Sequence, residues 1–201
     1  MVLDNKLGIT NQIELSKEEE RISKIAAKEL FDGGKLDELT PGTFESLRII
    51  HKALFGEIYS FAGEIRKENI AKGNFRFAPV LYLEESIKQI EKMPQDTFDH
   101  ILEKYVEMNV AHPFREGNGR STRIWLDVIL KKQLKKAVDW SKIDKDEYLN
   151  AMINSPVNDK AIKDLIKNSL TDKIDDRELY MKGIDHSYFY EGYKEYRVED
   201  L

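Results

Sequence analysis

Apolar residues recur every three or four positions along most of the chain, which is the spacing of one face of a helix. Residues 16–19, Ser-Lys-Glu-Glu, have the form of a capping box, and an apolar stripe that includes Ile22, Ile25 and Leu30 follows them. We therefore predict a first helix that begins at Ser16 and ends at the glycine pair 33–34.

A second helix is predicted after Thr40-Pro41, with the threonine as its N-cap and the proline as its first residue. Leu47, Ile50, Leu54 and Ile58 would form its buried stripe. Further helices are expected at about 84–93, 97–111, 119–134, 144–153 and 158–169, and at 174–197 with a break or kink near Gly183 and Gly192.

The segment from Lys72 to Leu83 lacks helical spacing. Its aromatic residues lie beside the turn-forming pair Gly73-Asn74 and beside Pro79, which favours a short β-hairpin. No repeat, low-complexity tract or flexible linker divides the chain. The pattern predicts one all-α domain over residues 1–201, with one short β-hairpin.

Composition narrows the class of protein. A chain of 201 residues with 41% hydrophobic content can bury one core, and its net charge of -5 argues against a nucleic-acid partner. The sequence contains no cysteine, which suits a reducing compartment. It also shows neither an apolar leader nor a stretch long enough to span a bilayer. We expect a cytoplasmic protein without a membrane partner; whether it forms a homo-oligomer is left open.

The segment from His112 to Arg123 carries the candidate chemistry. Gly117-Asn118-Gly119 contains residue types that tolerate left-handed backbone conformations and allow a ligand to approach the main chain. A helix is predicted directly after it, and the start of a helix offers unpaired N–H groups and the positive end of the helix dipole. The pattern predicts an anion cradle, formed by residues 117–119 and this helix start, of a kind suited to phosphates.

The charged residues around this cradle strengthen the prediction. Arg120 and Arg123 share one face of the first helical turns, where the dipole disfavours cations, so an anionic partner explains them better than helix stability does. Glu116 is the type of oxygen ligand that a phosphate-bridging Mg²⁺ requires. His112, at the end of the preceding helix, is placed to accept a proton from an attacking hydroxyl.

Each of these features has a simpler structural explanation. A lone histidine is more often a hydrogen-bonded structural residue, and Gly-Asn-Gly is often only a turn. Glu116 and Arg120 could form a surface ion pair worth about 0.3–0.5 kcal/mol. A helical interaction module, or a nucleotide-binding regulator without turnover, is therefore an alternative to an enzyme.

Taken together, residues 112–123 resemble the Fic motif, HPFx[DE]GNGRxxR, at every defined position. Residues 51–66 resemble the family's stretch before its flap, and residues 72–77 resemble the flap hairpin. The resemblance implies a Fic-type helical bundle that transfers AMP from ATP to a Ser, Thr or Tyr hydroxyl of a target protein. The identity of the target is not encoded in these motifs.

The resemblance also implies roles for individual residues. His112 would be the general base, and Glu116 would bind Mg²⁺, or another divalent cation such as Ca²⁺. The nucleotide would be held by Arg115, Gly117, Asn118, Gly119, Arg120 and Arg123, with Tyr148 on the adenosine side. Lys72, Gly73, Asn74 and Phe75 would dock the target. The phosphorylating branch of the family carries lysine in place of Gly119, so glycine favours AMP transfer over transfer of a different phosphate-containing group.

Near the end of the chain, Ser187, Glu191 and Gly192 match the form of the family's inhibitory helix, [ST]xxxE[GN], expected here at about 185–197. Glu191 would pair with Arg123 and so deprive ATP of a cation. Some Fic proteins with this helix also remove AMP from the modified target. The resemblance therefore makes Glu191 a candidate catalytic residue for that reverse reaction, besides its inhibitory role.

Overall fold

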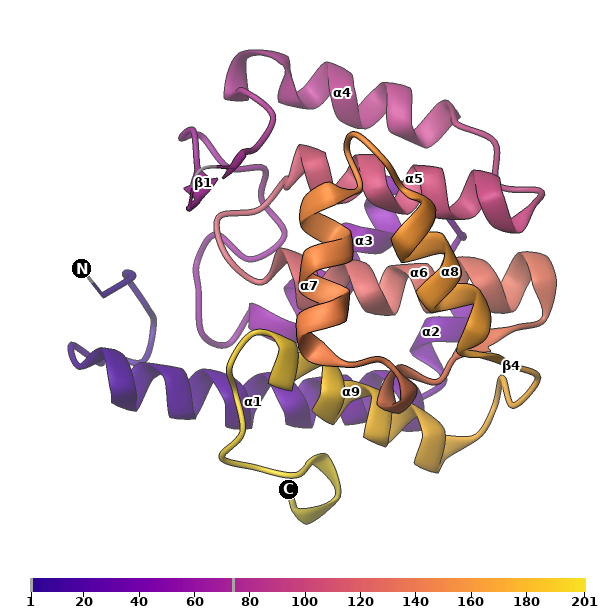
Figure 1. Ribbon diagram of the computed structural model, residues 1–201. Coiled ribbons are helices and arrows are strands. Elements are labelled where there is room, and N and C mark those ends of the chain that lie inside the picture. Colours follow the sequence, from indigo (N-terminus) through magenta and orange to yellow (C-terminus); the bar gives the residue numbers. More distant parts are fainter. Residues whose placement is uncertain (1, 74) are drawn as a thin grey trace.

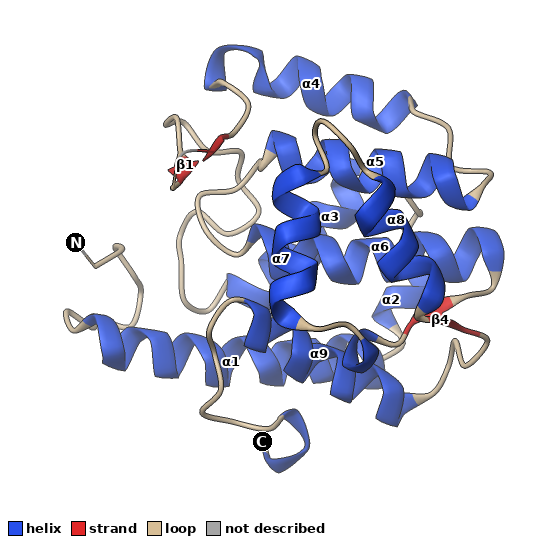
Figure 2. Ribbon diagram, viewed as in Figure 1, coloured by secondary structure: helices blue, strands red, loops and turns tan. Residues whose placement is uncertain are grey.

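The computed structural model describes residues 2–73 and 75–201 as a mostly helical molecule with small two-stranded sheets (Figures 1 and 2). Helix α6 (Asn118–Leu134) occupies the centre and packs against α3 (Phe44–Phe55), α5 (Phe98–Ala111) and α9 (Arg177–Tyr190). The long helix α1 (Gln12–Asp32) packs against α3 on one side and α9 on another. Helix α1, near one end of the chain, and α9, near the other, therefore both belong to the group of helices packed around α6 and its neighbour α3.

The remaining elements surround this centre. They are α2 (Lys35–Glu38), α4 (Val80–Lys92), α7 (Lys145–Asn154), α8 (Lys160–Asn168) and the 3-10 turns Trp140–Lys142 and Val198–Asp200. Strands β1 (Ala71–Lys72) and β2 (Phe75–Arg76) form the predicted hairpin. A second antiparallel pair, β3 (Ala137–Val138) with β4 (Leu170–Thr171), was not predicted, because two residues per strand leave no periodic signal.

The core is built from the predicted apolar stripes except in α1, where Ile22 and Ile25 are only half-buried and Glu19, Glu20 and Lys24 are buried instead. Leu47, Ile50 and Leu54 of α3 are fully buried and face α6, where Trp125 and Leu126 are equally inaccessible. Helix α6 is buried over most of its circumference because other helices cover it on several sides, with apolar residues in its middle and polar motif residues in its first turns. This fixes the position of its first turn, where the motif residues lie.

Two helix starts differ from the prediction by about one turn. Helix α1 begins at Gln12, because Asn11 caps it by accepting from the N–H groups of Ile13 and Glu14. The predicted capping box at residues 16–19 lies inside the helix. Helix α3 is capped by Thr43 rather than by Thr40, so Pro41 lies in the turn before it.

Two further boundaries were also wrong. Helix α4 begins at Val80, so Tyr82 and Leu83 belong to it and not to the hairpin. Helix α9 passes through Gly183 without a break and ends at Tyr190. Glu191 is its C-cap, and Gly192 has a φ of +93°, so the helix expected at 185–197 stops before the glutamate.

Within residues 2–73 and 75–201, no helix has the length and apolar character needed to cross a bilayer.

Candidate active site

The motif forms a tight loop between α5 and α6. Helix α5 ends at His112, whose backbone is left-handed (φ 49°), and α6 begins directly after Gly117 (φ 77°). The Asn118 side chain closes the loop, because it accepts from Phe114 N–H (2.9 Å) and donates to Phe114 C=O (2.7 Å). A Cβ at Gly117 would lie 2.3 Å from the Phe55 ring, so the backbone needs glycine there.

The tautomer of His112 is set by its hydrogen bond. Its Nδ1 lies 3.2 Å from the carbonyl oxygen of Asn109 and therefore donates, which leaves the Nε2 lone pair free. The imidazole ring stacks on Phe77 with 3.6 Å between ring centroids. Burial lowers the pKa of His112 to about 4. The residue is therefore neutral at physiological pH, in the protonation state of a base.

Two side chains from the stretch 51–66 hold this loop, and sequence reasoning did not single them out. Buried Arg66 donates from Nε to the His112 carbonyl (2.7 Å) and from Nη2 to the Ala111 carbonyl (3.1 Å). His51 accepts from Gly63 N–H at Nδ1 (2.9 Å), so its Nε2 donates to the Glu116 carbonyl (2.8 Å). Burial lowers the pKa of His51 to about 4, which keeps it neutral and structural.

Arg123 is buried and all of its guanidinium nitrogens are occupied. Its Nε donates to the Ser187 hydroxyl (2.7 Å), and Nη2 donates to the Ser187 carbonyl (2.9 Å) and to Glu191 Oε1 (2.9 Å). Its Nη1 donates to the Tyr148 hydroxyl (3.2 Å). The predicted pair between Glu191 and Arg123 is therefore present, and the residues that hold Arg123 come largely from the chain's C-terminal segment.

The position of Glu191 depends on a glycine and two cations. A Cβ at Gly119 would lie 2.3 Å from Glu191 Oε1, so a side chain there would displace the carboxylate. Lys72 of β1 lies 3.5 Å from Glu191 Oε2. Although burial favours the neutral acid, Arg123 and Lys72 lower the pKa of Glu191 to about 2. Glu191 is therefore ionised.

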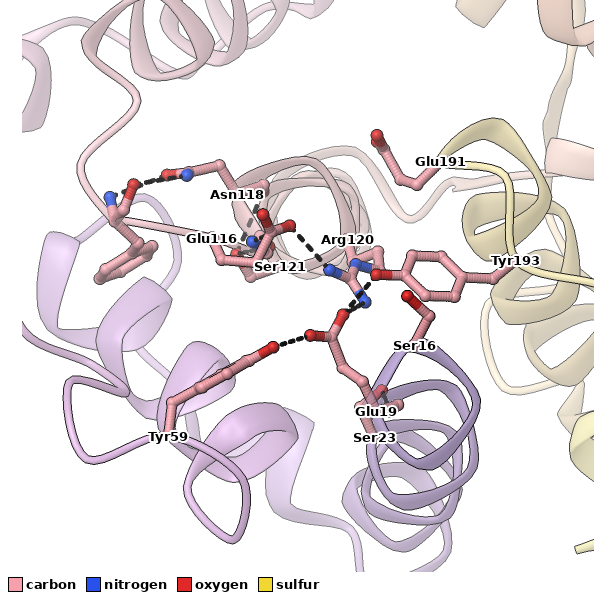
Figure 3. Close-up of polar contacts among 12 residues, drawn as sticks. Ser16, Glu19, Ser23, Tyr59, Glu116, Asn118, Arg120, Ser121, Glu191 and Tyr193 are labelled. Atoms are coloured by element: carbon pink, nitrogen blue, oxygen red, sulfur yellow. Dashed lines mark hydrogen bonds and ion pairs between the residues drawn. The ribbon is translucent and has the colours of Figure 1, made fainter. Parts of the chain in front are cut away.

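Arg120 has a different set of partners (Figure 3). It donates to Glu116 Oε1 (3.0 Å) and to Glu19 Oε1 (2.6 Å), a buried carboxylate on α1. The hydroxyls of Tyr59 and Tyr193 also donate to Glu19. Burial opposes ionisation, but Arg120 and the two tyrosines hold the pKa of Glu19 below its ordinary value. Glu19 was predicted only as part of a capping box, and it lies 101 positions from Arg120.

The other predicted residues lie around this centre. Tyr148 is buried beneath Arg123 and bonds to the Tyr105 hydroxyl (2.6 Å), so its contact with adenosine stays a prediction. Arg115 is exposed and pairs with Glu68 (2.8 Å). Gly73, in the hairpin, and Phe75, on β2, precede Phe77, which covers His112. Asn74 lies outside the described residues.

The start of α6 fits an anion, and Glu116 fits a single metal contact. The first N–H groups of α6 have no acceptor within the helix and lie beside Gly117 and Gly119. Among residues 2–73 and 75–201, no three His, Asp or Glu side chains are grouped as a metal site. A lone carboxylate beside a phosphate cradle is nevertheless the donor set that suits Mg²⁺, which keeps most of its waters and shares phosphate oxygens.

Fold and motif define a class of protein, and comparison with known proteins supplies the family. The sequence profile of the Fic/DOC family matches residues 41–130. A probable protein adenylyltransferase of Sinorhizobium fredii, y4lH, is 30% identical over 166 residues, which cover 77% of this chain and 83% of that protein. The chain belongs to the Fic/DOC family.

A longer relative matches over more of the chain. The protein adenylyltransferase VbhT of Bartonella schoenbuchensis is 32% identical over 188 residues, which cover 85% of this chain but 37% of that protein. The chain thus spans little more than a third of VbhT.

Solved structures share the fold. BepC of Bartonella tribocorum, crystallised with AMPPNP, superposes with a TM-score of 0.69 at 22% identity and covers 85% of this chain and 93% of that chain. The N-terminal Fic domain of a Bep effector from Bartonella sp. AR 15-3 gives a TM-score of 0.70 at 21% identity. The predicted Fic-type helical fold is confirmed, with a second small sheet added.

Proposed function

We propose that this protein transfers AMP from ATP to a hydroxyl group of a target protein. The observation that carries the proposal is the neutral His112, with its Nε2 lone pair free, beside the start of α6. A protein that only bound nucleotide would need the cradle but not a base at this position. The names of VbhT and y4lH, both adenylyltransferases or probable ones, support the same reaction.

In this reaction the target hydroxyl oxygen forms a bond to the α-phosphorus of ATP. The bond from that phosphorus to the oxygen bridging the α- and β-phosphates breaks, and pyrophosphate leaves. His112 Nε2 takes the hydroxyl proton, and the N–H groups at the start of α6 bind phosphate oxygens. Glu116 would hold Mg²⁺, which when bound neutralises charge on the phosphates.

The C-terminal segment acts as an inhibitor in this proposal. Arg123 would bind the γ-phosphate, but Ser187 and Glu191 occupy its donors and Glu191 lies beside Gly119. Charge-assisted hydrogen bonds of this kind are worth about 1.5–3 kcal/mol each, so ATP would bind more weakly, or in an unreactive pose, while they persist. Glu191 and the γ-phosphate would compete for one cation.

The test compares transfer of label from α-³²P-ATP to lysate proteins. Glu191→Gly should label its targets faster than wild type, and His112→Ala in that background should lose about 10²–10⁴-fold in rate while still binding ATP. Glu195→Gly is the matched control, because Glu195 is a tail glutamate whose half-exposed side chain pairs with the surface residue Lys17. A Glu191→Gly variant no faster than Glu195→Gly would refute the inhibitory role.

The alternatives predict other patterns of label. A nucleotide-binding regulator would bind ATP without labelling any protein. Transfer of a phosphoryl group would label targets from γ-³²P-ATP instead of α-³²P-ATP. A helical interaction module would bind ATP neither with nor without Mg²⁺ in equilibrium dialysis.

We extend the proposal to removal of AMP from the modified target. A water oxygen would attack the phosphorus and the bond to the target oxygen would break; one proton of that water would stay on the released AMP, and the other would pass by way of His112 Nε2 to the target oxygen. A pKa of about 2 makes Glu191 a poor base while Arg123 holds it, so its role would be to orient the water rather than deprotonate it. AMP release from a premodified substrate should be faster with wild type than with Glu191→Gly; equal rates would leave only inhibition.

A further inference from the structure

The charge of Arg120 is confined to a buried site. Its side chain is 1% exposed, and three aromatic rings surround the guanidinium with centroids 4.6–5.3 Å from its carbon. Glu19 and Glu116 take one terminal nitrogen each. If Arg120 swung toward a ligand, Glu19 would be left buried and unpaired, which is costly. Arg120 is therefore held where it is by Glu19.

Glu116 is fixed through one carboxylate oxygen only. Oε1 accepts from Arg120 (3.0 Å) and from Gly117 N–H (2.9 Å). No hydrogen bond to Oε2 is found from the part of the chain that the structure describes, and the side chain is 43% exposed. One oxygen thus orients the carboxylate and the other faces outward.

The three charges must be counted together. Arg120 alone would cancel the charge of Glu116, and the pair would offer little attraction to a divalent cation. Glu19 adds a second negative charge, so the triad has a net charge of −1. We propose that Glu19 is a positioning residue that offsets the charge of Arg120, so that Glu116 keeps the negative charge a divalent cation needs. The proposal rests on the proposed function and makes α1 part of the active site.

The experiment measures ATP binding by equilibrium dialysis, with Mg²⁺ and with EDTA, in the Glu191→Gly background. The readout is the factor by which Mg²⁺ strengthens ATP binding. Glu19→Gln keeps the shape of the side chain and removes its charge, so this factor should fall about tenfold, the order of effect a unit charge exerts across a partly solvated site. Binding of ATP without Mg²⁺ should stay equal or improve, because a negative charge near the phosphates is lost.

A merely structural defect would behave differently, since it would weaken ATP binding with and without Mg²⁺ alike. Glu20→Gln is the matched control: Glu20 is a buried carboxylate one residue further along α1 that pairs with Lys24 (3.0 Å). It should leave the Mg²⁺ factor close to that of the parent.

A second variant keeps the proposal falsifiable if Glu19→Gln folds poorly. Glu19→Asp keeps the negative charge on a shorter side chain, so the Mg²⁺ factor should stay close to the parental value. An unchanged factor in Glu19→Gln, or a factor that falls as far in Glu19→Asp as in Glu19→Gln, would overturn the inference. A parent that binds no ATP in either buffer would instead overturn the proposed function.

Discussion

At the scale of single residues, Gly119 and Arg123 decide what can occupy the site. Ser187, Glu191 and Tyr148 take four of the five guanidinium N–H donors of Arg123. Any side chain at position 119 would collide with Glu191 Oε1. The glycine proposed to give phosphates access to the main chain therefore also admits the carboxylate of Glu191, and a phosphate and that carboxylate cannot share this space.

The neutral state of His112 leads to a pH prediction. Its folded-state pKa of about 4 lies below the ordinary 6.5, so the stability contributed by neutral His112 is present above pH 6.5 and is lost as the pH falls toward 4. In Glu191→Gly the pKa should be lower still, because the Glu191 carboxylate raises it. As the pH is lowered, the kcat/KM of that variant should therefore not decline with a midpoint near pH 6.5.

Proton NMR titration checks this prediction directly. The chain has four histidines, and the resonance absent from His112→Ala identifies the one in question. A midpoint near 6.5 for that resonance, in a protein still folded by circular dichroism, would contradict the proposed burial of the base. The His51 resonance, also expected near pH 4, serves as an internal comparison.

The motif residues could be predicted from sequence because they are adjacent along the chain. Their partners could not. Glu19 reaches Arg120 across 101 positions, and Arg66 reaches His112 across 46. In the sequence Glu19 looks like the glutamate of a capping box, and Arg66 is one charged residue of the stretch that resembles the family's segment before its flap. Only the packing of α1 against α3 and α9 shows that Glu19 is buried at the site.

At the scale of elements, helices were predicted well and their ends were not. Apolar stripes specify which face is buried, but Asn11 and Thr43 capped α1 and α3 in competition with equally plausible residues nearby. A helix was predicted over 174–197 with a break or kink near Gly183 and Gly192. Helix α9 runs through Gly183 but does end beside Gly192, whose backbone is left-handed, and this places Glu191 at the cap, where its side chain reaches Arg123.

The hairpin supports a prediction about target docking. Phe77 N–H donates to the Ile70 carbonyl (3.3 Å), and bonded and non-bonded pairs alternate in an antiparallel ladder. The pair Ala71 and Arg76 is therefore non-bonded, and the main-chain groups of these two residues point outward from opposite edges. If a target segment adds as a strand, one of the two edges must receive it.

Proline substitution distinguishes the two edges, since each removes one outward N–H. In the Glu191→Gly background, either Ala71→Pro or Arg76→Pro should strongly reduce labelling of lysate proteins, and the other should have the smaller effect. ATP binding should be unchanged in both. If both variants label as well as their parent, strand addition at the hairpin is wrong.

At the scale of the whole molecule, the C-terminal segment lies beside α1 (Figure 1), and polar residues of the two contact each other. Glu20 of α1 accepts from the N–H groups of Glu195 (3.0 Å) and Tyr196 (3.3 Å). Lys24 donates to the Tyr196 carbonyl (2.6 Å) and pairs with Glu20 and Asp185, each at 3.0 Å. Glu20 and Lys24 are both buried. Helix α1 thus anchors the segment that carries Glu191.

This anchor predicts that a change in α1 releases the inhibitory segment. Lys24→Met keeps an apolar stem but leaves Glu20 and Asp185 without their cation, and breaking a buried pair in this way costs about 3–5 kcal/mol. The strain should be relieved by detachment of the tail. Trypsin should then cleave faster after Lys194 and Arg197, and AMP transfer should rise although Glu191 is unchanged.

Lys17→Met is the control for this change. Lys17 also lies on α1 and pairs with Glu195, but at 3.6 Å and with both side chains about half exposed, a contact worth at most about 1 kcal/mol. It should alter neither cleavage nor transfer.

The decisive comparison uses the double variant that combines Lys24→Met with Glu191→Gly. If tail release activates only by withdrawing Glu191, the double variant should transfer AMP no faster than Glu191→Gly alone. Fast cleavage without any rise in transfer would show that the anchor and the inhibitory contact are independent.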